Sequence, residues 1–141
     1  MKKIFSILCI IIVYANTAIA QVTISISELT GTKWQLTDVF NRHSSAYYEF
    51  TRNAFIWHRE DGTTSSYPYY LSATIPTKFD FTKVGVSTKG CYYIEYNDKR
   101  NIFSCYAIIC FNKSTGKMIH KRKIPEDVIG LSDTVTYILK K

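Results

Sequence analysis

The residue types in this chain that could carry catalysis are three histidines, His43, His58 and His120, together with Cys91. Either His58 or His120 could in principle activate the Cys91 thiol as a nucleophile. However, the sequence contains no HExxH, GxSxG or P-loop pattern. Cysteine is most often a small buried hydrophobe, so a structural role outweighs the catalytic one. We therefore expect a protein without catalysis.

The densest basic run could bind an anion. It comprises Lys117, His120, Lys121, Arg122 and Lys123. One interpretation is a site for envelope phosphates or acidic glycans. The other is an edge or solvent-facing strand, on which lysines deter pairing with another sheet edge. We favour the second interpretation.

A set of large, mostly aromatic side chains could line a ligand cavity. Its members are Trp34, Tyr48, Phe50, Phe55, Trp57, Tyr69, Leu71, Tyr92, Ile94 and Tyr106. The alternative is that these side chains simply fill a small barrel, because eight-stranded barrels have the size at which either outcome occurs. Tyrosine favours a cavity, since its buried hydroxyl needs water or another partner. The aromatic members of the set are our candidate ligand-binding residues.

These side chains must be positioned by β-strands, because aromatic and β-branched residues favour strands and no long helical stripe occurs. The expected strands are 31–39, 46–51, 54–59, 63–72, 91–96, 102–111, 117–123 and 134–139. The segment 125–130 fits one short helical turn before the last strand, with a proline at its start and a glycine at its end. Eight short strands joined by tight turns predict an up-and-down barrel or a sandwich.

The turn between the strands 91–96 and 102–111 decides the environment of two cysteines. A five-residue turn, 97–101, would place Cys91 opposite Ala107, diagonal to Cys105 and too far for an unstrained bridge. A three-residue turn would pair the two cysteines, and an even-length turn would put them on opposite faces. We favour the five-residue turn and expect Cys91, Cys105 and Cys110 to be free, buried thiols. No CxxC occurs, so the cysteine spacing gives no support for structural zinc.

The first twenty residues are predicted to be a signal peptide. A basic start, an apolar run from Ile4 to Tyr14 and a small-x-small site at Ala18 to Ala20 predict cleavage before Gln21. The apolar run is too short to span a membrane. Cleavage lowers the formal net charge from +7 to +5. We expect an exported, monomeric, single-domain protein, residues 21–141, that binds no nucleic acid.

Four stretches resemble a known family. Leu29 to Leu36 resembles the first strand of lipocalin-like (calycin) domains, in which a glycine and a tryptophan mark the start of the barrel. The segments 69–72, 79–85 and 137–140 are similar to those of small exported lipocalin-like proteins of Bacteroidetes type. The resemblance implies an eight-stranded barrel that can hold an apolar small molecule, with Trp34 packed at the closed end against a basic residue such as Lys140.

Together, the residues and the resemblance predict an all-β, single antiparallel, lipocalin-like up-and-down barrel of about eight strands, without metal or cofactor. We expect it to bind a small apolar or amphipathic ligand in the periplasm or outside the cell. The alternative is an interaction module with a filled interior that binds a protein or a glycan by an outer face or loop.

Overall fold

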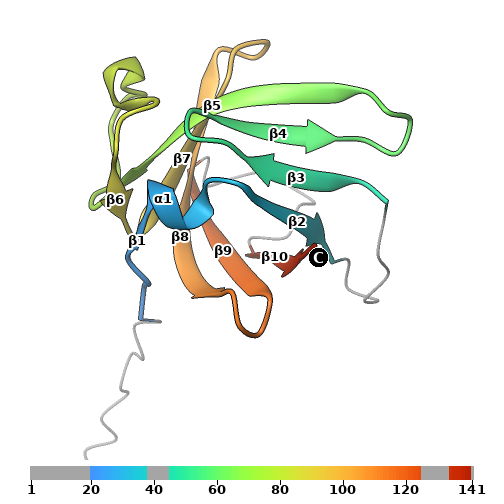
Figure 1. The fold of residues 1–141 in the computed structure, drawn as a ribbon. Helices are drawn as coiled ribbons and strands as arrows, with labels where there is room; N and C mark the ends of the chain where they lie inside the picture. The colour runs from blue at the N-terminus through green and yellow to red at the C-terminus, as the bar shows by residue number, and fades with distance from the viewer. Residues whose placement is uncertain (1–19, 38–44, 125–133, 141) are drawn as a thin grey trace, which may run out of the picture.

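The structure is a computed structural model and describes residues 20–37, 45–124 and 134–140. Eight antiparallel strands form a closed barrel in the order β10-β2-β3-β4-β5-β7-β8-β9 (Figure 1). The strands are β2 (Thr32–Leu36), β3 (Tyr47–Phe50), β4 (Ala54–His58), β5 (Thr64–Ser72), β7 (Tyr92–Asn97), β8 (Ile102–Asn112), β9 (Lys117–Ile124) and β10 (Thr134–Leu139). The predicted all-β barrel of eight strands is confirmed. The helical turn expected at 125–130 lies outside the described residues.

One end of the barrel is packed against a short helix that the sequence analysis did not predict. The helix α1 (Ile26–Leu29) follows the two-residue strand β1 (Ile24–Ser25). At its start the Glu28 carboxylate accepts a hydrogen bond of 2.7 Å from the Ser25 backbone N–H. Ile26 and Leu29 join the buried cluster that contains Trp34. This end is therefore apolar and filled.

Trp34 is completely buried there, and its hydrogen bonds connect β2 to α1. Its indole N–H donates to the Thr32 hydroxyl at 2.8 Å, and that hydroxyl donates to the Leu29 carbonyl at 2.6 Å. The basic partner implied by the resemblance lies elsewhere. The Lys140 ammonium stands 3.9 Å from the ring centroid of Tyr47, which is on the outer face of β3. The expected contact between Trp34 and Lys140 is therefore wrong.

The turn between β7 and β8 has four residues, so the predicted five-residue turn is wrong. Asn97 pairs with Ile102, and Tyr93 pairs with Tyr106. The left-handed conformation of Asn101, at φ 53°, allows the tighter connection. A shift of one residue moves every side chain of a strand to the other face. Tyr93 consequently points into the barrel and Tyr92 points out of it.

A second buried cluster covers the outer face of β7. It joins Tyr70, Phe79, Ile94 and Cys105, with Tyr92 and Tyr96 packed against it. Phe79 comes from the segment 73–88, which contains the one-turn helix η1 (Phe81–Lys83) and leads into β6 (Lys89–Gly90). The segment 73–88 covers the barrel wall, because Phe79 packs against the outer face of β7 and β6 at its end pairs with β1.

The basic run lies on β9, which pairs with β8 on one side and β10 on the other. The strand is therefore not an edge strand, and that part of the prediction is wrong. Lys117 is exposed and Lys121 and Lys123 are partly exposed, which agrees with the solvent-facing alternative. His120, in the middle of the run, is completely buried inside the barrel. No helix within the described residues is long and apolar enough to cross a membrane.

Candidate functional site

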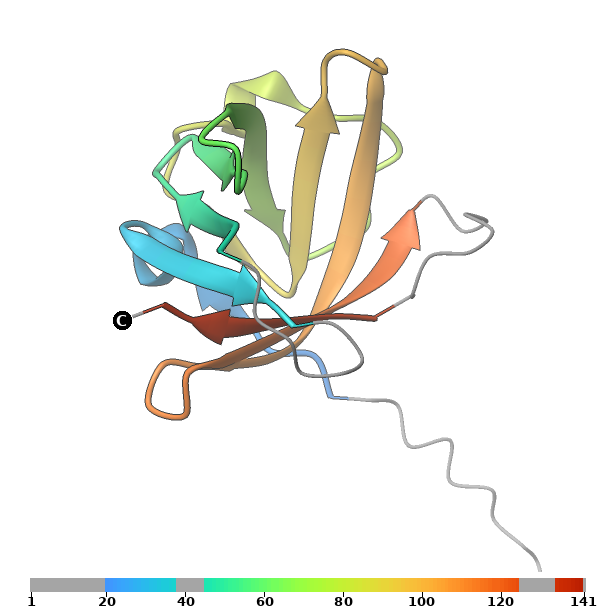
Figure 2. The ribbon, with the colours of Figure 1, turned by 90° about the vertical axis from the view of Figure 1, so that its right-hand side faces the viewer.

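The interior at the other end of the barrel contains a cavity of about 260 Å³. Figure 2 shows the strands arranged around this interior. The cavity residues lie where β2, β4 and β7 end and where β3, β5, β8 and β10 begin, because neighbouring strands are antiparallel. They are Leu36, Tyr48, Phe55, Trp57, Tyr67, Glu95, Asn97, Tyr106, Val135 and Tyr137.

Aromatic rings make up most of the cavity wall. Tyr48 is at its centre, stacked on Phe55 with ring centroids 4.8 Å apart and on Trp57 at 6.1 Å. Tyr137 meets the Tyr48 ring edge-on at 5.8 Å. Tyr48 and Trp57 come from the neighbouring strands β3 and β4 and pair directly, whereas Tyr137 comes from β10, beyond β2. The wall therefore offers flat apolar faces to a ligand.

A carboxyl group lies among these rings. Glu95 is on β7, two residues beyond Tyr93, whose hydroxyl donates to it at 3.0 Å. Burial raises the pKa of Glu95 from 4.5 to about 7, although the Tyr93 hydrogen bond and the Arg122 guanidinium lower it. An acid in a cavity with so large a shift is a candidate functional group.

Two arginines near the cavity are engaged with other groups. The Arg59 guanidinium lies 4.2 Å from the Trp57 ring centroid and donates to the Ser65 hydroxyl at 2.6 Å. The Arg122 guanidinium lies 5.9 Å from the ring centroid of Tyr106. Of these two described arginines, neither forms an ion pair with Glu95. The carboxylate is therefore only partly compensated.

His120 lies deeper in the same interior. Its ring stacks on Tyr93 at 5.3 Å and meets Tyr137 edge-on at 5.2 Å. Both ring nitrogens are buried without a hydrogen-bond partner among the described residues. Burial lowers the pKa of His120 from 6.5 to about 3, so the imidazole is neutral at ordinary pH.

The structure brings together some of the candidate ligand-binding residues and separates others. Four of them line the cavity: Tyr48, Phe55, Trp57 and Tyr106. Three others, Trp34, Phe50 and Tyr69, are buried in the core cluster. Tyr92 lies outside the barrel wall, as does Ile94, which the larger aromatic set also included.

Glu95 and Tyr93 were missed by the sequence analysis. Their strand reads Tyr-Tyr-Ile-Glu-Tyr-Asn, which has large side chains on both faces. The only available signal was the acidic residue within an otherwise apolar strand. An isolated acid there indicates either an outward face or a polar site inside, and the register decides which.

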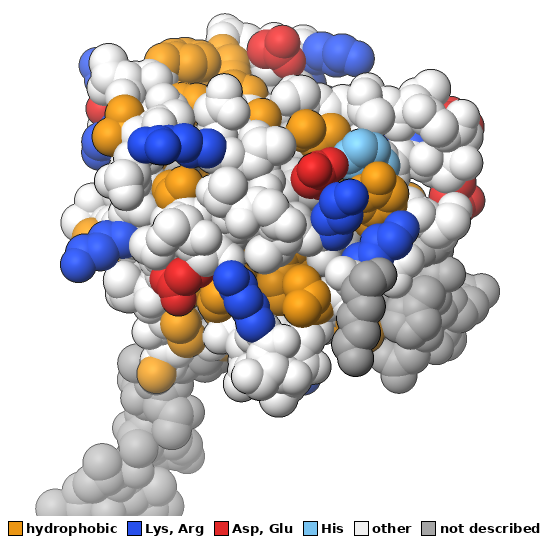
Figure 3. Space-filling model, in the orientation of Figure 1, with side chains coloured by type: hydrophobic (Ala, Val, Ile, Leu, Met, Phe, Trp, Pro, Cys, Tyr) orange, Lys and Arg blue, Asp and Glu red, His pale blue; other side chains and the backbone are white. Residues whose placement is uncertain are grey.

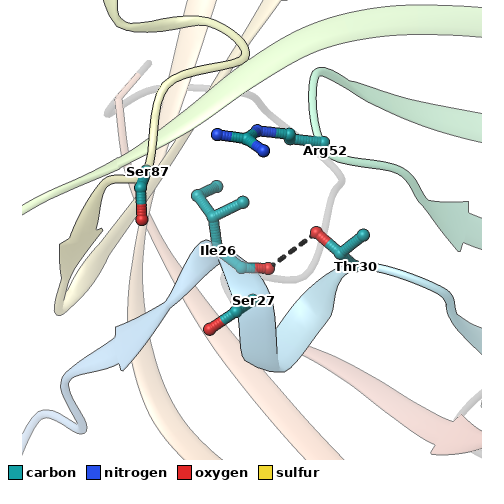
Figure 4. A pocket seen from close by; sticks show the side chains of 5 residues that line it. All are labelled: Ile26, Ser27, Thr30, Arg52 and Ser87. Atoms are coloured by element: carbon teal, nitrogen blue, oxygen red, sulfur yellow. Dashed lines mark hydrogen bonds between the residues drawn. The ribbon is translucent and has the colours of Figure 1, made fainter.

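A second hollow lies outside the barrel, beside α1, and has a volume of about 280 Å³. Figure 4 shows the Arg52 side chain above Ile26, with Ser27 and Thr30 below. The Thr30 hydroxyl donates to the Ile26 carbonyl at 2.9 Å, and Arg52 Nε donates to the Gly85 carbonyl at 2.9 Å. Thr30 and Arg52 thus already use these polar groups within the protein, Thr30 toward the helix α1 and Arg52 toward the segment 73–88. The interior cavity is therefore the stronger candidate site.

Among the described residues, no three His, Cys, Asp or Glu side chains are placed to hold a metal ion. The chain matches no protein-family model, no curated protein and no solved structure. The fold and the cavity define a small closed β-barrel, filled at one end and hollow at the other. Its interior carries a half-buried carboxyl group, that of Glu95, among aromatic rings.

Proposed function

We propose that this protein binds a small amphipathic ligand in the interior cavity. The observation that carries the proposal is the combination of aromatic wall and single carboxyl group in one cavity. Ligand sites are typically apolar hollows with a few placed polar groups, and this one, at about 260 Å³, lies just below their usual size range of about 300–1,000 Å³. The apolar part of the ligand would lie against Tyr48 and Trp57, with its polar part near Glu95.

The proposal includes binding without catalysis, in an exported, lipocalin-like monomer. Support for export comes from the signal-peptide pattern of residues 1–20. Support for a lipocalin-like protein comes from the first strand, where Trp34 is buried at the filled end of the barrel. A carrier of this kind needs a cavity and a rigid wall, and it needs no nucleophile.

Native mass spectrometry of the protein purified from its own host tests the proposal, because a retained ligand appears as added mass. The variant Val135→Trp places a large side chain in the cavity, whereas Ile138→Trp adds the same bulk on an outward-facing position of the same strand. We expect added mass in the native protein and in Ile138→Trp, and none in Val135→Trp. Absence of added mass from all three would contradict the proposal, as would retention by Val135→Trp.

The second candidate is an interaction module that binds a protein or a glycan. Phe81 favours it, because its side chain is 58% exposed while its ring still contacts Phe79 and Tyr96. Figure 3 shows apolar side chains gathered at the top of the view, over η1 and the β7–β8 hairpin. Exposed apolar patches mark interaction sites. Loss of partner binding in Phe81→Ser, with Val135→Trp unaffected, would favour this candidate.

A further inference from the structure

We infer that the ligand of the interior cavity carries a protonated amine, which pairs with the Glu95 carboxylate between aromatic ring faces. This inference rests on the proposed function and adds the chemical class of the ligand. It depends on the position of Glu95, the ring faces around it and the partners already taken by the neighbouring arginines.

Glu95 faces the cavity and accepts one hydrogen bond from the described residues. Tyr93 donates to its Oε2 atom. An ionised carboxylate can accept about four hydrogen bonds, and the described residues supply one of them. A primary ammonium group has three donors and supplies charge as well as hydrogen bonds. It therefore fits this acceptor better than a neutral hydroxyl does.

Several titratable or charged groups face Glu95 from the other strands. Four of them interact electrostatically with it, and they come from β3, β8, β9 and β10. They are Tyr48, Tyr106, Arg122 and Tyr137. Burial raises the pKa of each of the three tyrosines, so these are neutral hydroxyls and add no negative charge. Among the described residues that line the cavity, Glu95 is thus the single anionic group.

No cation among the described residues forms an ion pair with Glu95. Arg59 stacks on Trp57 and donates to Ser65, and Arg122 lies over the Tyr106 ring. The pKa of Glu95 stays at about 7 despite Arg122, so that guanidinium compensates the carboxylate only in part. A charge partly removed from water is stabilised by a partner of opposite sign, and the cavity of about 260 Å³ leaves room for one.

The aromatic rings around Glu95 can attract a cation. Ammonium groups are attracted to the faces of tryptophan and tyrosine rings within about 6 Å. The lining provides Tyr48, Trp57 and Tyr137 beside the carboxylate. Aromatic faces together with one carboxylate discriminate against anionic ligands, because an anion would be repelled by Glu95.

Binding of the amine should weaken as the pH falls. The ammonium pairs with ionised Glu95, whose pKa in the free protein is about 7. Above this pH the Glu95 carboxyl group of the free protein is ionised and can pair with the ammonium directly. Below it a proton must be displaced, so the affinity drops by up to about tenfold per pH unit.

Isothermal titration calorimetry with three matched probes tests the inference. 2-Phenylethylamine, 2-phenylethanol and 3-phenylpropionate share one apolar body and differ in charge. The variant Glu95→Gln removes the carboxylate. Its control is Glu49→Gln, which removes an outer-face carboxylate that accepts from His58 at 2.9 Å.

At pH 8 we expect the amine to bind at least about tenfold more tightly than the alcohol, as one charge-assisted hydrogen bond allows. Glu95→Gln and a fall to pH 5.5 should each remove this preference, and Glu49→Gln should keep it. Equal binding of amine and alcohol, unaffected by Glu95→Gln, would overturn the inference and leave the proposed cavity function standing. Preference for 3-phenylpropionate would overturn it in favour of an anionic ligand. No binding of any probe would overturn both.

Discussion

Tyr93 and Glu95 lie two residues apart on one strand and are joined inside the barrel by a hydrogen bond of 3.0 Å. Both side chains share a face because strand side chains alternate. The Tyr93 ring also stacks on His120. Tyr93 therefore contacts two interior groups, the half-buried Glu95 and the buried His120, and the pKa of Glu95 is raised while that of His120 is lowered.

The two displacements should produce opposing pH dependences of stability. Between pH 4.5 and 7, Glu95 holds a proton in the folded state that the unfolded chain has lost, so its contribution falls as pH rises. Between pH 3 and 6.5, the unfolded chain protonates His120 and the folded state does not, so its contribution increases with pH. From pH 4.5 to 6.5 the two contributions should largely cancel.

Single variants should uncover each contribution. In Glu95→Gln the free energy of unfolding should rise from pH 4.5 to 6.5, and in His120→Phe it should fall, each by at most about 1.4 kcal/mol per pH unit. Urea denaturation across this range measures both slopes. Parallel profiles for Glu95→Gln and His120→Phe would contradict the assignment.

Trp34→Ala should lose about 3–5 kcal/mol of stability, since a fully buried tryptophan leaves a cavity when truncated. The loss includes the indole hydrogen bond to Thr32. Phe81→Ala is the control, because that ring is largely exposed and should change stability far less. Chemical denaturation measures both. An unchanged denaturation midpoint for Trp34→Ala would show that the filled end of the barrel is not packed as described.

Gly90→Ala should destabilise the junction between β6 and β5. A Cβ atom at Gly90 would lie 2.0 Å from the Ser72 carbonyl oxygen, so the backbone would have to move. Overpacking of this kind costs about 1–3 kcal/mol or more. Lys89→Ala, at the exposed neighbouring position, should have little effect. Equal thermal melting temperatures of the two variants would show that β5 and β6 are not in such close contact.

Thiol counting on the mature protein should give three reactive groups after denaturation without reductant, since Cys91, Cys105 and Cys110 are all free. In the native protein, Cys105 should react slowest. It is buried, as predicted, and burial raises the pKa of its thiol to about 12. Cys91 and Cys110 are only partly buried, contrary to expectation, and should react faster. A count of one would indicate a disulfide bond.

N-terminal sequencing of exported protein should begin at Gln21. The small side chains at Ala18 and Ala20 are those that a signal peptidase accepts. Ala20→Tyr should block processing, whereas the conservative Ala20→Ser should not. A protein that still begins at Met1 after export would contradict the signal-peptide prediction.

The sequence allowed the barrel to be predicted because most of its strands have one apolar and one polar face. The strand β7 does not follow this rule. Ile94 is buried and Tyr92 partly buried under the segment 73–88, while Tyr93 and Glu95 face the interior. With both faces covered, alternation cannot fix the register. The prediction of a five-residue turn instead of a four-residue one therefore placed Tyr92, rather than Tyr93, inside the barrel.

Other parts of the fold could have been found by closer reading. Ser25 and Glu28 have the spacing of a capping box, which predicts the start of α1. The role of Glu95 could not have been predicted in this way. Its pKa depends on burial by rings from strands that are distant in sequence, and only the closed barrel brings those rings together.

The pairing of Leu139 with Trp34 joins the last strand to the first strand of the barrel. The two residues are separated by almost the whole described chain, so the loop closed by this contact carries a large entropic cost. β10 must also insert between β2 and β9, which cannot be joined to each other until it arrives. We therefore expect docking of the last strand to limit the folding rate, and a chain lacking residues 134–141 should stay an open, unfinished sheet.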